Sequence, residues 1–145
     1  MRDLLEIQAS LHAYRDFSEC VLRSIEWRNH ATSVVLTIDY PWTPSGIIRS
    51  DHAERLLVDL DFALVQEFSV KNQLPPDCVR DPSLISWGLT EISIVRIRDD
   101  DLSEQYRTPD TAFHHMTVRR EGSDWIEIVF ADLSVSERTE PANGR

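Results

Sequence analysis

Apolar residues near the start of the chain recur at the spacing of a helix. Leu4, Ile7, Leu11 and Tyr14 lie three or four positions apart, which places them on one helical face. Asp3 stands before them, where a negative charge interacts favourably with the helix dipole. The pattern predicts a helix from about residue 3 to residue 14.

Most of the remaining chain alternates between apolar and polar residues, which is typical of half-buried strands. The clearest case is segment 56–64, where apolar residues take the even positions while Arg55, Asp59 and Asp61 take odd ones. Similar alternation predicts strands near residues 21–27, 34–40, 85–96, 113–120 and 125–133, and a short strand through Phe68 and Val70. Turn residues at 29–31 and 121–124 predict two hairpins, and the proline-containing segments 41–46 and 74–82 predict loops.

One helix and about six largely antiparallel strands favour a mainly β fold, at the margin of the α+β class, with the strands in one sheet or a sandwich. A length of 145 residues with 41% hydrophobic content fits a single domain, which we expect to span residues 1–135. Residues 136–145 lack apolar anchors and contain Pro141 and Gly144, so we predict a flexible C-terminal tail there.

The charge balance disfavours one large class of partners. With 25 acidic and 15 basic residues the formal net charge is −10, so a broad attraction to phosphate backbones is hard to build and nucleic acid is not expected as a partner. No apolar run approaches a membrane span, and the start of the chain is unlike a signal peptide, so we expect no membrane association and a cytoplasmic location. Cys20 and Cys78 lie far apart, which suits buried thiols in a reducing compartment.

Motifs of the common enzyme mechanisms are missing from the sequence. It contains no Gly-rich phosphate loop, no His-Glu-x-x-His, no Cys-x-x-Cys and no Gly-x-Ser-x-Gly. Asp99, Asp101 and Ser103 have the opening spacing of a calcium loop, but Glu104 stands where the sharp turn needs glycine. His114 and His115 are neighbours on a predicted strand and therefore point to opposite faces. We predict a non-enzymatic protein with no cofactor and no metal site.

Trp42 is the tryptophan whose placement the pattern leaves open. Trp27, Trp87 and Trp125 fall within predicted strands, whereas Trp42 lies in the proline-containing loop. An exposed tryptophan in a rigid loop is a good binding anchor, because it offers a large contact area at low entropic cost. The other interpretation is that Trp42 packs onto the core.

Several segments together carry a resemblance to a known family. Phe17-Ser18-Glu19-Cys20-Val21 leads into a first strand, strands follow at 34–39 and 56–62, Asn72 comes after them, and Ile126–Phe130 closes the series. Over about residues 15–130 this order resembles small bacterial β-rich immunity proteins, and the nearest match is the immunity protein 50 family of polymorphic toxin systems. The chain keeps the Phe and Val of that family's Phe-His-Asp start and has Ser-Glu in place of His-Asp. The resemblance implies a protein that neutralises a toxin by binding it.

Such a role would account for the negative charge. Many toxin domains are basic, and an acidic inhibitor would meet one with complementary potential and a fast on-rate. We therefore expect a protein partner, with a basic toxin domain as the hypothesis, while the oligomeric state stays open. The candidate partner-binding residues are Asp59, Asp61, Asp99, Asp100, Asp101, Glu104 and Trp42.

Two alternatives come from other classes. A small-molecule-binding or catalytic β fold would hold its ligand in a cleft near Trp87, His115 and Trp125. It would need a concave apolar pocket with a few converging polar groups. A scaffold protein without either activity is the third interpretation.

Overall fold

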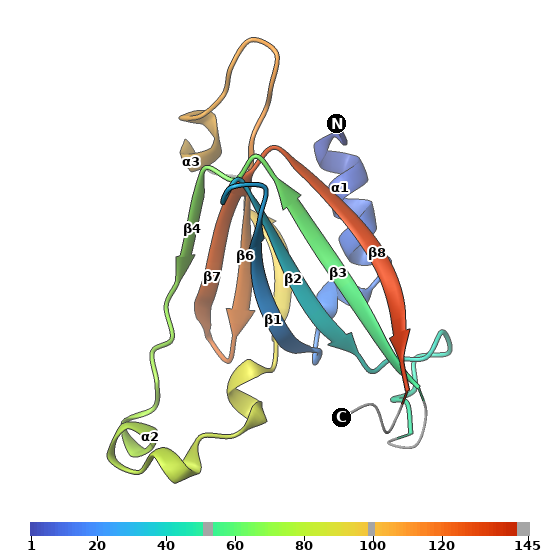
Figure 1. Ribbon diagram of the computed structural model, residues 1–145, viewed down its shortest axis with the longest axis vertical. Coiled ribbons are helices and arrows are strands. Elements are labelled where there is room, and N and C mark those ends of the chain that lie inside the picture. The colour runs from blue at the N-terminus through green and yellow to red at the C-terminus, as the bar shows by residue number, and fades with distance from the viewer. Residues whose placement is uncertain (51–53, 99–100, 142–145) are drawn as a thin grey trace.

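The strands pair into two antiparallel sheets, which lie against each other in a sandwich (Figure 1). The computed structural model describes residues 1–50, 54–98 and 101–141, without the side chains of Trp87, Gly88 and Asp101. The strand order is β1-β2-β3-β8 in the first sheet and β4-β7-β6-β5 in the second. The predicted mainly β fold with an N-terminal helix is confirmed.

The elements have the following bounds. The first sheet contains β1 (Val21–Arg28), β2 (Ser33–Tyr40), β3 (Arg55–Ala63) and β8 (Asp132–Glu140). The second contains β4 (Glu67–Val70), β5 (Ile94–Arg98), β6 (His114–Arg120) and β7 (Ser123–Phe130). The helices are α1 (Leu4–His12), α2 (Pro76–Arg80) and α3 (Asp101–Glu104), with 3-10 turns η1 (Arg15–Phe17), η2 (Pro82–Leu84) and η3 (Trp87–Thr90).

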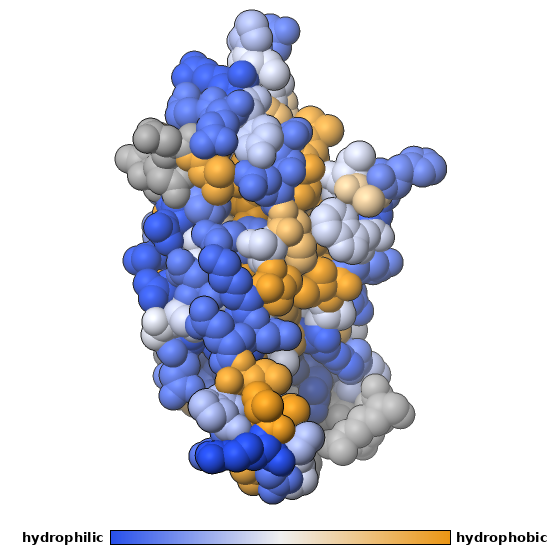
Figure 2. Space-filling model, turned by 90° about the vertical axis from the view of Figure 1, so that its left-hand side faces the viewer, coloured by the Kyte–Doolittle hydropathy of each residue, from blue (hydrophilic) through white to orange (hydrophobic). Residues whose placement is uncertain are grey.

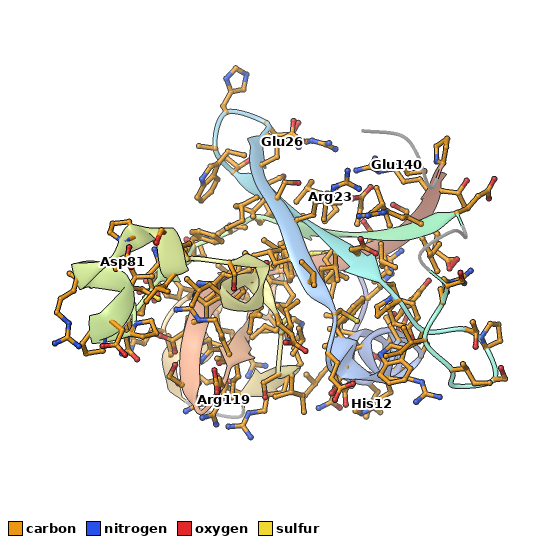
Figure 3. All side chains as sticks on the ribbon, turned by 90° about the horizontal axis from the view of Figure 1, so that it is seen from below. His12, Arg23, Glu26, Asp81, Arg119 and Glu140 are labelled. Carbon is orange, nitrogen blue, oxygen red and sulfur yellow. The ribbon has the colours of Figure 1, made fainter. Side chains whose placement is uncertain are left out.

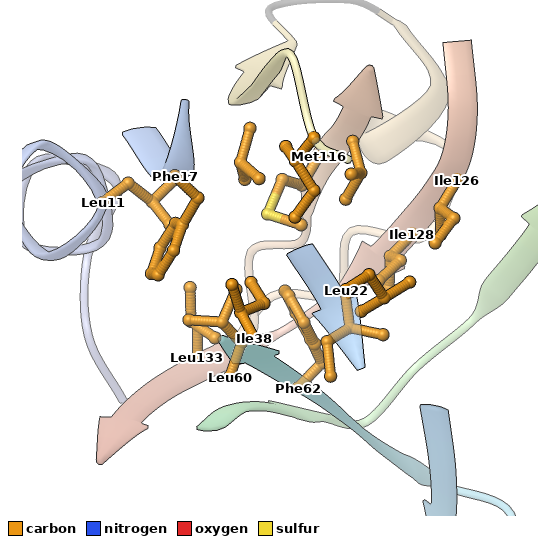
Figure 4. Packing of buried hydrophobic residues seen from close by; sticks show 14 of the residues in the cluster. Leu11, Phe17, Leu22, Ile38, Leu60, Phe62, Met116, Ile126, Ile128 and Leu133 are labelled. Atoms are coloured by element: carbon orange, nitrogen blue, oxygen red, sulfur yellow. The ribbon is translucent and has the colours of Figure 1, made fainter. Parts of the chain in front are cut away.

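The inner faces of the two sheets form one hydrophobic core (Figure 4). On β3 the side chains of Val58, Leu60 and Phe62 are fully buried, which confirms the predicted inward direction of these even positions. Phe62 meets Phe130 of the opposite sheet edge to face, with ring centroids 4.9 Å apart. Aromatic pairs in this geometry add to the stabilisation from burial alone.

Helix α1 closes one flank of this sandwich. The Asp3 carboxylate caps it by accepting a hydrogen bond from the backbone N–H of Glu6 at 2.8 Å. Its apolar residues Ile7 and Leu11 are buried against the edge strands β5 and β8. Figure 1 shows α1 beside β8, on the side of the molecule away from β4.

The chain passes from one sheet to the other at two neighbouring corners. Between β7 and β8 the corner is a single residue, Ala131, whose N–H donates to the carbonyl of Ala63 at 3.0 Å. Between β3 and β4, Gln66 donates to the carbonyl of Val129 at 2.8 Å. The predicted strand 125–133 is therefore wrong as one element, because its two parts belong to different sheets.

Two further predictions need correction. The tail predicted from residue 136 is wrong as far as Glu140, because β8 pairs with β3 through Ser136 opposite Asp59 and Glu140 opposite Arg55. This half of an edge strand has water on both faces, so it shows no apolar alternation. The last residues, 142–145, lie outside the described part. The predicted strand 85–96 begins only at Ile94, and η3 precedes it.

Among the described residues, no helix combines the length and the apolar composition that crossing a bilayer requires.

Truncating Phe62 should test whether both sheets unfold as one unit. We expect Phe62→Ala to lower the free energy of unfolding by about 3–5 kcal/mol, because it leaves a cavity between the sheets. Leu5→Ala is the control: this α1 side chain is 75% exposed, and its loss should change stability by less than about 0.5 kcal/mol. Urea denaturation followed by circular dichroism and by tryptophan fluorescence measures both. Two separate transitions would contradict a shared core.

Candidate protein-binding surface

Asp59 and Asp61, two of the predicted partner-binding residues, lie on the outer face of the first sheet. Asp59 accepts hydrogen bonds from Thr37 Oγ1 at 2.7 Å and from Arg138 Nε at 3.0 Å. Only 20% of its side chain is exposed. Its negative charge is therefore already paired within the chain.

The rest of this outer face is paired in the same way. Arg23 lies 2.8 Å from Glu140, Arg28 lies 3.1 Å from Glu26, and Arg55 lies 3.2 Å from Asp39. Figure 3 shows Arg23, Glu26 and Glu140 on one side of the molecule and Arg119 of the second sheet on the other. The described strands place six carboxylates and four guanidinium groups on this face: Glu26, Asp39, Asp59, Asp61, Asp132 and Glu140, with Arg23, Arg28, Arg55 and Arg138; Asp132 is paired with Arg2 at 3.4 Å. The surface at Asp59 and Asp61 is nearly neutral overall.

The pairing shifts the titration of Asp59. Burial raises the pKa of its carboxyl, but the hydrogen bonds from Thr37 and Arg138 and the charges of Arg138 and Arg28 together outweigh that effect. The pKa of Asp59 consequently lies below its ordinary value, and the ionised form stabilises the fold.

The other predicted acidic residues belong to the segment before β6. Asp99 and Asp100 lie outside the described residues, and the side chain of Asp101 is not described either. Glu104 ends α3; its side chain is exposed and lies 3.6 Å from that of Arg107. Glu104 also lines a hollow of about 570 Å³ at the α1 end of the sandwich.

This hollow combines acidic and apolar side chains from four parts of the chain. The start of α1 contributes Asp3 and Leu4, β5 contributes Ile97, α3 contributes Glu104, and the segment before β6 contributes Asp110 and Phe113. The carboxylate of Asp110 has no partner among the described residues. Two arginines also line the hollow, but each faces a carboxylate: Arg2 lies 3.4 Å from Asp132, and Arg98 lies 3.3 Å from Asp124.

His114 forms part of the wall of the same hollow. Its half-buried ring lies 5.8 Å from the ring of Phe130. Burial lowers the pKa of His114, against the smaller opposing effect of Asp132 and Asp3. The ring is therefore mainly neutral at pH 7 and can both donate and accept a hydrogen bond.

Trp42 is half-buried and packs against the core, as one of the two sequence interpretations had it. Its indole Nε1 donates to the carbonyl of Ser18 at 2.9 Å. The guanidinium carbon of Arg15 lies 4.9 Å from the centre of its ring. The indole is thus engaged on both its polar edge and one face, so it does not project as a free anchor.

The residues of the alternative cleft are occupied by packing within the chain. His115 is buried, with Nε2 at 3.3 Å from a carboxylate oxygen of Glu127. Trp125 is also buried; its indole donates to Asn72 at 3.2 Å, and Arg120 stacks over its ring. Neither lines the hollow at the α1 end, and the side chain of Trp87 is not described. In the part of the chain that the structure describes, no three His, Cys, Asp or Glu side chains gather as a metal site.

Sequence reasoning missed a second surface, the flank between the edge strands β1 and β4. Trp27 of β1 meets Phe68 of β4 edge to face, with ring centroids 5.1 Å apart. Ile25, Trp27 and Val70 remain 38%, 46% and 42% exposed. Figure 2 faces this side of the molecule and shows hydrophobic side chains in a broken line between polar ones. Alternation predicted the strand that holds Ile25 and Trp27, but it does not show that β1 is an edge strand.

The pairing of Asp59 predicts a pH-dependent loss of stability. The pKa of Asp59 is lower in the folded protein than its ordinary value of about 3.9, so its stabilisation is complete above about pH 4 and is lost as the pH falls through the folded pKa. Asp59→Asn should cost about 1–2 kcal/mol at pH 7, and the difference from the natural chain should shrink below pH 4. Chemical denaturation at a series of pH values measures this, with Asp61→Asn as the control. A cost that stays constant down to pH 2 would exclude an ionised Asp59 as its source.

Comparison with known proteins adds one structural neighbour. No family model matches the sequence, and no curated protein matches it, so the resemblance to immunity proteins stays a prediction. A crystal structure of an uncharacterized protein from Neisseria gonorrhoeae superposes with a TM-score of 0.50, covering 82% of this chain and 91% of that chain. The two are 10% identical in sequence, so the likeness is one of fold alone.

Proposed function

We propose that this chain is a non-enzymatic protein-binding domain of the immunity type, which neutralises a basic toxin domain in the cytoplasm by binding it. The resemblance of its segments to immunity proteins and its net charge of −10 support this role. A binding role also agrees with a sequence that contains none of the common catalytic motifs.

The observation that carries the proposal is the acidic hollow at the α1 end. Its apolar walls, from Leu4, Ile97 and Phe113, suit the aliphatic stem of a lysine or arginine. Asp110, which has no partner among the described residues, can receive the cationic head, beside Glu104, which lies 3.6 Å from Arg107, and Asp3, which caps α1. A single long basic side chain of a partner would then act as the anchor of the interface.

The distribution of charge supports this end of the molecule over the outer sheet face. On the outer face Glu26, Asp39, Asp59 and Glu140 already have arginine partners, so binding a basic partner at them would first require breaking ion pairs. At the α1 end Asp110 has no partner among the described residues. Negative charge at this end would steer a basic partner and raise the on-rate at low salt.

The second candidate function is the binding of a small molecule. The hollow at the α1 end is the better site for it, because His115 is buried and packed within the chain. A volume of about 570 Å³ lies within the range of ligand pockets, roughly 300–1,000 Å³. The mainly neutral ring of His114 in its wall offers a polar contact among apolar ones. A ligand that copurifies with the chain and is lost in His114→Leu would favour this candidate.

Charge reversal in the hollow tests the proposed function. We expect Glu104→Lys/Asp110→Lys to weaken binding of the toxin by about tenfold to a hundredfold, because two attractive contacts become repulsive. The tagged chain is purified from its host, the captured protein is identified, and that protein is expressed alone and with each variant. Growth inhibition by the captured protein, rescued by the natural chain and not by the double variant, is the expected result.

The matched control carries the same change of charge elsewhere. Asp77→Lys/Glu121→Lys alters two exposed acidic residues, in α2 and in the turn between β6 and β7, that do not line the hollow. It should rescue growth as well as the natural chain does. A captured protein that does not inhibit growth would refute the immunity role, and equal rescue by both double variants would refute the hollow as its binding site.

A further inference from the structure

The sandwich has a second flank, which no helix of the described residues covers. On the first flank α1 buries Ile7 and Leu11 between β5 and β8. On the other flank the inner-face residues Ile25 and Trp27 of β1 and Val70 of β4 stay partly exposed. This opening is rimmed by two edge strands, and partly exposed apolar side chains beside a free strand edge mark a site for pairing with another chain.

Among the four edge strands, β1 offers the longest unprotected stretch. β4 is only four residues long, and β5 contacts α1 and η1. β8 contacts α1, and its exposed second half carries Glu137, Arg138 and Glu140, so charges protect it on both faces.

On its free side β1 is bridged at its first residue, Val21 to Glu91, and contacts η3, and the two residues before it are paired with Ile92. The N–H of Glu19 donates to the carbonyl of Ile92 at 2.8 Å, and the N–H of Ile92 donates to that of Cys20 at 2.7 Å. From residue 23 to residue 28 no described strand pairs with that side, and all six residues are exposed. The stretch contains neither proline nor glycine, which would discourage pairing.

We propose that two copies of this chain associate through antiparallel pairing of this free edge, with Trp27 of one copy opposite Trp27 of the second. The pairing would join the two β1-β2-β3-β8 sheets into one continuous sheet. It would also bring the apolar flanks of the two copies together about a two-fold axis, which is the symmetry of most homodimers. This inference concerns a surface other than the acidic hollow and does not depend on the proposed function.

The charges along β1 favour this register over those centred on the two residues beside Trp27. Side chains opposite each other in an antiparallel pair must lie on the same face, so in a two-fold pairing some residue of β1 faces its own copy. A pairing centred on Glu26 or on Arg28 would place like charges opposite each other, which is destabilising. A pairing centred on Trp27 places Glu26 opposite Arg28 of the second copy, and it does so twice. Glu26 and Arg28 already form an ion pair 3.1 Å long within one chain, and the pairing would set the two ion pairs side by side with charges alternating.

The same register makes use of the exposed indole. Trp27 already rests on Phe68 with one part of its ring, and 46% of the residue is open to solvent. Directly opposite residues in an antiparallel pair have Cβ atoms about 4.5–5.5 Å apart, so the two indoles would cover each other. Tryptophan is enriched at the centres of protein interfaces for this reason.

A charge swap tests both the surface and the register. The natural chain should show a concentration-dependent monomer–dimer equilibrium in sedimentation velocity. Glu26→Arg or Arg28→Glu alone should weaken the dimer by about tenfold or more, because two opposite-charge pairs become like-charge pairs. The double variant Glu26→Arg/Arg28→Glu should restore it. Both side chains are at least half exposed, so the variants are expected to fold, and circular dichroism checks this.

Each other outcome overturns the proposal. A natural chain that stays monomeric at the highest concentration it tolerates refutes self-association. A dimer that survives both single changes refutes this surface, and a double variant that stays dissociated refutes the register. Glu104→Lys/Asp110→Lys, made for the acidic hollow, is the matched control and should dimerise normally, so failure of one proposal leaves the other intact.

Discussion

The structure depends on how the edges of a two-sheet sandwich are covered. Two packed sheets bury their inner faces against each other, but the core stays open to water along both flanks, where the edge strands run. Helix α1 closes the flank between β5 and β8 with Ile7 and Leu11. Within the described part of the chain no helix covers the flank between β1 and β4, and its inner-face residues Ile25, Trp27 and Val70 remain partly exposed. Because α1 covers only one of the two flanks, the flank between β1 and β4 is suited to pairing with another chain.

The arginines explain how so acidic a chain builds a stable outer sheet face. Val35 and Leu57 point outward on the first sheet and yet are buried. Long charged side chains such as those of Arg28 and Arg138 cover apolar surface with their stems while their heads pair with carboxylates. The outer face is therefore nearly neutral, and the surplus of negative charge belongs to loops and chain ends. The acidic hollow at the α1 end is one of those places, which is why it carries the functional proposal.

The two proposed binding surfaces lie on different parts of the molecule and depend on different interactions. The acidic hollow depends on charge and would be sensitive to salt, whereas the free edge of β1 depends on backbone pairing and on the burial of Trp27. A dimer through β1 leaves the α1 end of each copy unpaired. Two hollows in one particle could then bind two toxin domains, with a gain in avidity only where those two domains are themselves joined.

By itself the sequence determined the class of the fold and the direction of most core side chains. Alternation along 56–62 settled which residues of β3 face inward, because strand geometry sends neighbouring side chains to opposite faces whatever the partner strand. Helical spacing likewise placed Ile7 and Leu11 on a buried face. The direction of a side chain on a strand or helix depends only on its position in that element, so the spacing of apolar residues is sufficient to predict it.

Only the tertiary structure decided which strands are edges, which charges are paired and where a hollow forms. The second half of β8 is held by backbone hydrogen bonds to β3, which leave no mark on the pattern of side chains. Asp59 looked like free acidic surface because its partner Arg138 lies 79 residues further along the chain. Trp27 lies in a strand that the sequence predicted, and yet it is exposed because no described strand lies beyond β1. Each of these properties depends on a neighbour distant in sequence, and only the folded chain brings that neighbour into contact.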